Sequence, residues 1–469
     1  MPAVYGFGAA MDDIVEQLRD ALGDDQVIDA DDIEERYLRD WSSAPPHTPM
    51  ALVRPRSTAE VSTILSLCNQ AGVGVVAQGG MTGIAGAAIA AEDQIAMSLE
   101  RMRGVEEIDE AAATITAAAG TPIQALQEAA RERDFLFALD WGARGTATVG
   151  GGLATNAGGN RVIRYGMARE HVLGLEAVLA DGTVLSMMNK MQKNNAAYDL
   201  KQLFIGSEGT LGVITRAVFR LHPLPATACT ALCALPDYRS AIALLRHAQR
   251  RLMGAVGAFE LMWADYYGIA HEVGNARAPL PDGYPLYVLT DMLAADPEGD
   301  GARFERMLEE AMDAGWVLDA AIARSEKEVT GFWALRDEVA AILAAFTPCA
   351  TFDVSVPIGD IGTVVEILRE RMSRLWPGRV AMFFGHVGDS NLHFIFALPD
   401  DTAATELAVE EAVYEVVRDY HGSVSAEHGI GTIKKPFLSY SRSPAEIATM
   451  RGLKAALDPN GILNPGKVF

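Results

Sequence analysis

The chain has 469 residues, 49% of them hydrophobic, which is too long for one compact core but enough to build two or three lobes. Its formal net charge of -23 argues against a nucleic-acid partner or an anionic membrane surface, because phosphate binding needs a clustered positive surface. The same charge repels anions at long range. A site for an acidic substrate would therefore need local cations or a metal.

The first part of the chain predicts a short helical segment followed by a sheet domain. Over residues 1–45, helical spacing occurs in MDDIVEQLRDAL and again in DDIEERYLRDW, and it ends at the breaker SSAPPHTP. An apolar strand (MALVRP), a helix starting at Ser57 with Glu60 completing a capping box, and the strand VGVVAQ come next. Shorter strand-like runs follow (IAMSL, ATITAAAG, GLEAVLADGTVLSM, LGVITRAVFRL). We expect a mixed α+β domain over residues 46–225.

A second α+β domain is predicted over residues 226–428. Strands such as ALCAL and PLYVLTDML alternate there with the amphipathic helices DYRSAIALLRHAQRRLM and GARFERMLEEAMDAG. Residues 429–469 contain the helix AEIATMRGLKAALDP and an extended end. This tail is too small to fold alone, so we expect it to pack onto one of the larger domains.

From cysteine usage and hydropathy we expect a cytoplasmic protein. The four cysteines form no Cys-x-x-Cys pair, so we interpret them as buried thiols rather than as zinc ligands or disulfides. The N-terminus lacks a basic segment followed by an apolar run, and no apolar stretch reaches the roughly 18 residues of a transmembrane helix.

Three glycine-rich segments are candidates for binding a long ligand. The segment QGGMTGIAG (78–86) directly follows a predicted strand, where small residues let backbone amides approach a pyrophosphate. Its glycine spacing is not that of the dinucleotide-binding fingerprint. The segments TATVGGGLATNAGGN (146–160) and FIGSEGTLGVIT (204–215) are also rich in glycine and small hydroxyl residues. A single such segment is more often a structural turn, but three together favour convergence on one ligand.

These loops resemble those of the FAD-binding domain (PCMH type) of the vanillyl-alcohol oxidase superfamily, over roughly residues 45–225. The resemblance implies that the pyrophosphate is held by Gly79, Gly80, Thr82 and Gly83. It implies that the flavin and ribityl chain are lined by Thr148, Gly151, Asn156 and Gly158, with Ile214 near the adenosine. Four further residues complete the implied cofactor set: Gln78, Gly86, Gly209 and Asn464.

Two details of this resemblance concern the chemistry of FAD binding. Family members often show Asn where this chain has Met81, so a polar contact is lost or replaced at that position. Members that bond FAD covalently commonly use His or Cys, and neither occurs between Gln78 and Ala90. The resemblance therefore implies non-covalent FAD.

Histidines and carboxylates cluster in two glycine-flanked segments, FGHVGDSNLHF (384–394) and SAEHGIG (425–431). Two imidazoles and a carboxylate form a common catalytic site for zinc or manganese and leave coordination positions open for substrate oxygens. His386 and His393 could share one ion only if a turn lies between them, and the intervening GDSN supplies turn residues. A buried core histidine is the alternative, which we favour for His171, His222 and His421. Asp389 is interpreted as a turn former or a neighbour of a ligand.

These segments resemble the C-terminal domain of FAD-linked oxidases, in the branch of the D-lactate and D-2-hydroxyglutarate dehydrogenases and the glycolate oxidase D subunit. The ending LDPNGILNPGK (457–467) fits the closing motif of that family. The resemblance implies that His386, His393 and Glu427 bind the metal. It implies that His428 is the general base and that Asn391 lies close to substrate and flavin. It also implies that the tail packs on the FAD domain and that the protein is a homodimer.

The chemistry expected of such a site is the oxidation of a D-2-hydroxy acid to the 2-oxo acid, with hydride transfer to flavin. A metal would lower the pKa of the hydroxyl, and His428 would accept its proton. Arg336, in FWALRDE, is the candidate for a bidentate clamp on the substrate carboxylate, the alternative being an ion pair on a helix surface.

The expected substrate is less charged or bulkier than 2-hydroxyglutarate. Related enzymes often carry a lysine shortly before the segment DVSVP (353–357), where this chain has Thr351 and Phe352. We expect Phe352 or Trp333 to offer an apolar contact to the substrate. The expected electron acceptor is an electron-transfer flavoprotein, a quinone or a cytochrome. Two other functions are open: a metal-independent flavin oxidase or transferase of the same fold, and a non-catalytic FAD-binding subunit.

Overall fold

The computed structural model describes residues 7–274 and 277–469, and the chain divides into two compact units. The first unit comprises Met1–Gly159, Gly166–Leu224 and Glu427–Phe469. The second comprises Asn160–Tyr165 and Pro225–Ala426. The chain therefore leaves the first unit for six residues in the middle of the predicted FAD-binding domain, and it returns to that unit at Glu427.

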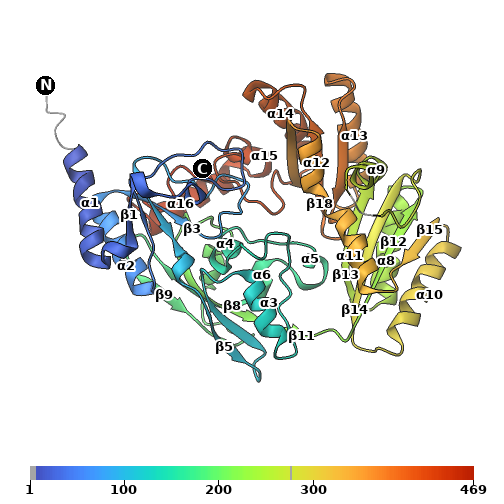
Figure 1. Cartoon of the computed structure of the whole chain (residues 1–469), viewed down its shortest axis with the longest axis horizontal. Helices are drawn as coiled ribbons and strands as arrows, with labels where there is room; N and C mark the ends of the chain where they lie inside the picture. The colour runs from blue at the N-terminus through green and yellow to red at the C-terminus, as the bar shows by residue number, and fades with distance from the viewer. Residues whose placement is uncertain (1–6, 275–276) are drawn as a thin grey trace. The chain divides into compact units, whose positions relative to one another are not determined.

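The first unit begins with a four-stranded sheet in the order β1-β2-β4-β3, whose strands are β1 (Val27–Asp29), β2 (Ala51–Val53), β3 (Gly74–Gln78) and β4 (Gln94–Ser98) (Figure 1). The strands β2, β4 and β3 are parallel, and β1 is antiparallel to β2. Helices α1 (Phe7–Leu22) and α2 (Thr58–Ala71) pack on it. The helix α2 begins where predicted, because the Ser57 hydroxyl accepts from the backbone N–H of Glu60. The Glu60 carboxylate accepts from the N–H of Arg56 and not from that of Ser57, so the predicted capping box is only half formed.

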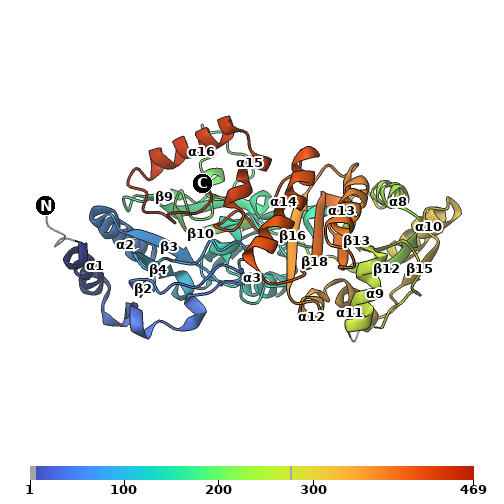
Figure 2. The same ribbon diagram turned by 90° about the horizontal axis from the view of Figure 1, so that it is seen from above.

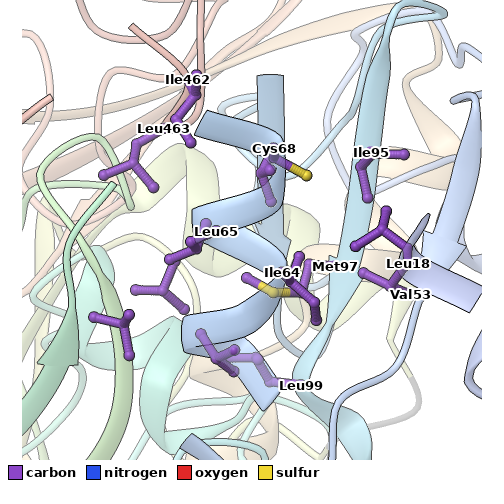
Figure 3. Close-up of a cluster of buried hydrophobic side chains, with 14 of the residues drawn as sticks. Leu18, Val53, Ile64, Leu65, Cys68, Ile95, Met97, Leu99, Ile462 and Leu463 are labelled. Carbon is purple, nitrogen blue, oxygen red and sulfur yellow. The ribbon is translucent and has the colours of Figure 1, made fainter. Parts of the chain in front are cut away.

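The core beneath this sheet joins both ends of the first unit. Figure 3 shows Leu18 of α1 and Ile64, Leu65 and Cys68 of α2 among the buried side chains, together with Ile462 and Leu463 from near the C-terminus. Backbone contacts add to the packing, since Leu463 forms a parallel bridge with Val75 of β3. The C-terminal segment completes a core that the N-terminal residues begin.

The second sheet of the first unit is antiparallel, in the order β5-β6-β10-β8-β9. Its strands are β5 (Val105–Asp109), β6 (Thr114–Ala118), β8 (Val172–Val178), β9 (Val184–Met187) and β10 (Val213–Arg220). A small pair joins β7 (Phe135–Leu136) to β11 (His222–Pro223). Besides α1 and α2, the described α-helices of this unit are α3 (Ile123–Arg131), α4 (Val149–Ala154), α6 (Ala168–His171), α7 (Lys201–Phe204), α15 (Leu438–Ser441) and α16 (Pro444–Leu457).

The second unit is built on a seven-stranded antiparallel sheet in the order β15-β12-β14-β13-β17-β18-β16, seen again in Figure 2. Its strands are β12 (Thr227–Leu235), β13 (Val256–Trp263), β14 (Leu286–Ala294), β15 (Asp319–Ile322), β16 (Cys349–Ser355), β17 (Ala381–Gly385) and β18 (Asn391–Ala397). Its helices are α5 (Val162–Tyr165), α8 (Tyr238–Arg251), α9 (Ala264–Val273), α10 (Asp300–Asp313), α11 (Glu326–Arg336), α12 (Val339–Ala345), α13 (Ile361–Leu375) and α14 (Ala403–Asp419).

Alternation along the strands gives this sheet two different faces. One face packs against α9, α11 and α12 through a core that includes Met262, Tyr287 and Phe384. On the other face, Phe352 and Phe394 stack with ring centroids 5.4 Å apart, and Tyr414 of α14 meets Phe352 edge-on. Phe352 is 3% exposed on this second face, opposite to the face of its strand neighbour Asp353. Its predicted contact with substrate stays a prediction that this packing does not favour.

The predicted helix over DDIEERYLRDW is wrong. The structure has two short 3-10 turns there, Ala30–Asp32 and Glu35–Tyr37. Tyr37 is buried, and its hydroxyl donates to a carboxylate oxygen of Glu100 at 2.5 Å. This long-range contact and the pairing of β1 with β2 fix the backbone more strongly than helical spacing does. Among the described helices, none combines the length and apolar composition needed to cross a membrane.

Candidate active site

A buried acid, an arginine and a histidine form the centre of the polar region in the second unit. Glu260 lies in β13, between apolar neighbours, and is 1% exposed. Its Oε1 lies 2.7 Å from Nδ1 of His386, and its Oε2 accepts from Nε of Arg336 at 2.8 Å. Arg336, the last residue of α11, is itself buried. It is therefore not the helix-surface ion pair that was the alternative to a substrate clamp.

The electrostatics of this cluster keep Glu260 ionised. Burial alone would raise the pKa of its carboxyl, but His386 and Arg336 outweigh burial and hold that pKa below its ordinary value. Burial would also lower the pKa of Arg336, and the Glu260 carboxylate raises it instead. With an ionised Glu260, Nδ1 of His386 is the donor. Its Nε2, 3.1 Å from Nη2 of Arg336, is then the nitrogen with a lone pair.

A tight turn brings His386 and His393 together within the second unit. The 3-10 turn Val387–Asp389 follows β17, and the N–H groups of Asp389 and Asn391 both donate to the carbonyl of His386, at 3.1 and 3.2 Å. Ser390 closes the turn with φ 75°. The two imidazole rings end up 5.2 Å apart between centroids and nearly perpendicular, at 78°. The GDSN segment thus forms the predicted turn that brings the two histidine rings close together.

Two further polar side chains are buried beside this turn. Asn391 is 4% exposed, and neither its Oδ1 nor its Nδ2 has a hydrogen-bond partner among the described residues. Buried amides without partners are costly, which makes Asn391 a candidate for contact with a ligand. Asp353 is paired with His393 across β16 and β18, and its Oδ1 lies 3.8 Å from Nδ1 of that histidine.

Sequence reasoning missed Glu260 and did not assign Asp353 a role, although the sequence carried a signal for both. Each is the single charged residue in a largely apolar strand, within VGAFELMW and CATFDVS. A carboxylate at such a position is expensive to bury unless it is paired, so it predicts a cationic or metal-binding neighbour. Trp333, the other predicted apolar contact, is partly buried and lies under the guanidinium of Arg161, 5.6 Å from its ring centroid.

The first two glycine-rich loops meet in the first unit. A Cβ on Gly79 would lie 2.5 Å from Oγ1 of Thr148 and 3.4 Å from Cα of Gly151. A Cβ on Gly80 would lie 2.1 Å from the carbonyl oxygen of Thr146. Glycine is therefore required at Gly79 by the nearby Thr148 hydroxyl and at Gly80 by the nearby backbone of Thr146. Oγ1 of Thr148 is buried without a hydrogen-bond partner among the described residues, which fits a polar ligand between these loops.

Other residues of the predicted cofactor set use their polar atoms within the fold. Gln78 donates to the carbonyls of Tyr37 and Ala88, and Oδ1 of Asn156 accepts from the N–H of Arg169. Asn464 donates to the carbonyls of Ala87 and Glu208. The remaining members occupy turns or a strand: Gly86 and Gly209 with positive φ, Thr82 and Gly83 in the first loop, buried Gly158, and Ile214 buried in β10.

A buried glutamate that sequence reasoning missed connects the third glycine-rich loop to the C-terminal segment. Both oxygens of Glu208 accept backbone N–H groups, from Ile430 and Gly431, each at 2.7 Å. Burial raises the pKa of Glu208, and these two bonds oppose that rise. Just upstream, Oε1 of Glu427 accepts from the N–H of Gly159 at 3.0 Å. Glu427 and His428 thus belong to the unit that contains the three glycine-rich loops. The other unit contains His386, His393, Asn391 and Arg336.

Comparison with known proteins gives the family. A model described as "FAD binding domain" matches residues 49–187, and one described as "FAD linked oxidases, C-terminal domain" matches residues 224–468. The chain is 38% identical over 442 residues to a D-2-hydroxyglutarate dehydrogenase of Xanthomonas citri pv. viticola, covering 93% of this chain and 92% of that protein. It is 37% identical to the mitochondrial D-2-hydroxyglutarate dehydrogenase of Bos taurus, covering 94% and 81%.

A solved structure of p-cresol methylhydroxylase with bound substrate has the same fold, with a TM-score of 0.78 at 16% identity, covering 99% of this chain and 98% of that one. The predicted α+β class, with an FAD-binding domain of the PCMH type and a second domain on an antiparallel sheet, is confirmed. The chain therefore belongs to the FAD-linked oxidases, the family resemblance that its sequence motifs indicated.

Proposed function

We propose that this protein oxidises a D-2-hydroxy acid to the 2-oxo acid, with non-covalent FAD and with a divalent metal held by His386, His393 and Glu427. FAD-dependent dehydrogenation of a hydroxy acid follows from family membership and from the named relatives. The metal goes beyond what family membership supports. Zinc and manganese both suit a set of two imidazoles and one carboxylate.

The observation that carries the metal proposal is the pairing of His386 with Glu260. A carboxylate 2.7 Å from Nδ1 fixes the tautomer and the ring orientation, which is the usual support of a metal-bound histidine. Nε2 would then bind the metal in place of its present contact with Nη2 of Arg336, 3.1 Å away. The ring of His393 crosses that of His386 at 78°. A histidine that served only the core would need neither a buried acid nor a second imidazole beside it.

Each group has a distinct role in this proposal. FAD supplies the acceptor for the hydride, and a bound metal supplies the charge that lowers the pKa of the substrate hydroxyl. His428 accepts the hydroxyl proton. Asn391 offers the unpaired amide to the substrate. Arg336 keeps the role of binding the substrate carboxylate through Nη1, whose contact with Asp337 is long, 3.4 Å.

The substrate side chain is proposed to be less charged or bulkier than that of 2-hydroxyglutarate. Thr351 shares a strand face with Asp353, since residues two apart point to the same side. It is exposed and carries no charge, and it lies shortly before the segment DVSVP, where the family resemblance implies a lysine. We further propose a homodimer and an electron-transfer flavoprotein, quinone or cytochrome as electron acceptor, in line with the family resemblance.

Anaerobic reduction of the bound flavin tests the function. Purified protein should be yellow, and one enantiomer in a panel of D- and L-2-hydroxy acids should bleach it. EDTA should abolish bleaching, and zinc or manganese should restore it. Bleaching that survives EDTA, in protein shown to contain no metal, would favour a metal-independent oxidase or transferase. A yellow protein that no hydroxy acid bleaches would favour a non-catalytic FAD-binding subunit.

A further inference from the structure

The six residues Asn160–Tyr165 belong to the second unit although they directly continue the second glycine-rich loop. Two arginines of this segment form hydrogen bonds with the sheet of the second unit. Arg161 donates from Nη1 to Oδ2 of Asp291 at 2.7 Å, and the other oxygen of this buried acid accepts from Thr230 at 2.8 Å. Arg164 donates to the carbonyls of Leu293 and Ala255. A charge-assisted pair with a buried acid, together with two carbonyl contacts, holds the segment to the second unit.

An irregularity in strand β13 of the second unit leaves space for the side chain of Arg161. The register of β13 against β14 shifts between Val256 and Ala258, so that Gly257 lies at the irregularity. A Cβ on Gly257 would lie 3.1 Å from Nη1 of Arg161 and 2.9 Å from Cγ of Leu293. A side chain there would displace Arg161 or Leu293. The irregular strand therefore makes room for the guanidinium.

Between its anchors, the segment packs against the turn that carries the histidines. A Cβ on Gly388 would lie 2.4 Å from Cδ1 and 3.2 Å from Cγ1 of Ile163, and 3.4 Å from Cβ of Phe259. Gly388 has no positive φ, so an alanine there would strain no backbone angle but would force the Ile163 side chain to shift. Gly388 lies two residues after His386 and three before Asn391. Ile163 therefore contacts the backbone that sets the direction of His386.

The residue before the segment contacts the third proposed ligand. The N–H of Gly159 donates to Oε1 of Glu427 at 3.0 Å, within the first unit. Gly159 is itself fixed, because φ is 113° and a Cβ would lie 2.1 Å from the carbonyl oxygen of Asp140. Seven consecutive residues thus contact Glu427 at one end and the histidine turn in the middle.

We infer that residues 159–165 position the metal ligands, with Ile163 against Gly388 as the contact that sets the histidine turn. This inference rests on the proposed metal site and adds positioning residues to it. Neighbours that orient a ligand typically change metal affinity by about tenfold or more when they are altered. Crowding at Gly388 should therefore weaken metal binding while leaving FAD in place.

The test is a rescue experiment read by zinc affinity in the FAD-containing protein, measured by competition with a chromogenic chelator. Gly388→Ala should weaken zinc binding about tenfold. Adding Ile163→Val, which removes the Cδ1 atom nearest the new methyl, should restore most of the affinity. Flavin content should match wild type in both variants. Gly268→Ala is the matched control, because no atom lies within 4 Å of a Cβ at that position.

Three outcomes would overturn the inference. Zinc affinity unchanged in Gly388→Ala would do so, as would a loss that Ile163→Val does not reverse. A wild-type protein that binds no zinc or manganese would remove the proposed metal site itself, and this result is separable because it needs no variant. If Gly388→Ala does not fold, Ile163→Ala removes the packing without crowding. It should still lower zinc affinity, and an unchanged affinity would contradict the inference.

Discussion

The first unit forms its glycine-rich loops from backbone and small side chains, with Gly79 and Gly80 against Thr146 and Thr148. The polar region of the second unit consists of charged side chains held in a buried network, with Glu260 between His386 and Arg336. The two regions should therefore fail for different reasons. Added volume should damage the first, because backbone approaches backbone. Loss of charge should damage the second, because a buried ion would lose its partner.

The largest effect is expected from Gly80→Val. Its Cβ would overlap the carbonyl of Thr146, 2.1 Å away, so the two loops would have to separate. We expect purified protein without flavin, measured by visible absorbance and by the flavin released on denaturation. Gly142→Val is the control in the same unit, since a Cβ there has no neighbour within 4 Å. Wild-type flavin content in Gly80→Val would show that the steric account of this region is wrong.

A smaller effect is expected from Glu260→Gln, which leaves Arg336 buried without its carboxylate. Breaking a buried ion pair from one side costs about 3–5 kcal/mol, so the free energy of unfolding in urea at pH 7 should fall by about that amount. The folded pKa of Glu260 is lowered, so its contribution is present above the ordinary glutamate pKa of about 4.3 and is lost as pH falls through the lower, folded pKa. In Glu260→Gln, the free energy of unfolding should lack the part of its decrease at acidic pH that comes from protonation of Glu260.

Glu310→Gln provides the contrast for this prediction. Glu310 pairs with Arg251, whose side chain is largely exposed, so solvent already screens that interaction. The free energy of unfolding should change much less in Glu310→Gln than in Glu260→Gln. Equal losses in the two variants would mean that burial of the Glu260 network contributes nothing particular to stability.

The smallest effect concerns a histidine of the first unit. His171 is 1% exposed, its ring meets His222 edge-on at 5.7 Å, and burial together with His222 lowers its pKa to about 4. An unfolded histidine binds its proton near pH 6.5, so folding stability falls as pH drops from about 6.5 towards about 4. At pH 5 the cost is about 2 kcal/mol relative to pH 7.

His171→Gln removes this titration. The difference in unfolding free energy between pH 7 and pH 5, measured in urea, should shrink by about 2 kcal/mol in the variant. An unchanged difference would mean that His171 takes up its proton without loss of stability. Such a result would also weaken our interpretation of this residue as a neutral core histidine.

Much of the fold was readable from the sequence because local signals agreed with the final structure. The strands over residues 51–53, 74–78 and 213–220 and the helix starting after Ser57 are apolar runs or capped amphipathic stretches. The helix predicted after residue 30 failed because Tyr37 makes a long-range contact with Glu100 that no local pattern encodes. The assignment of Asn160–Tyr165 to the second unit could not be predicted either, since the partners of Arg161 and Arg164 lie about 90 to 130 residues away.

For the site, the sequence by itself determined the residue types and the family: three glycine-rich loops, two histidines on a turn, and Glu427 beside His428. Only the tertiary structure decided which side chains support them. It paired His386 with Glu260, bound Arg336 to the same acid, placed Phe352 on the opposite face of the sheet and set Ile163 against Gly388. The physical reason is that chemical identity is local in sequence, whereas burial and pairing depend on strands and segments brought together by folding.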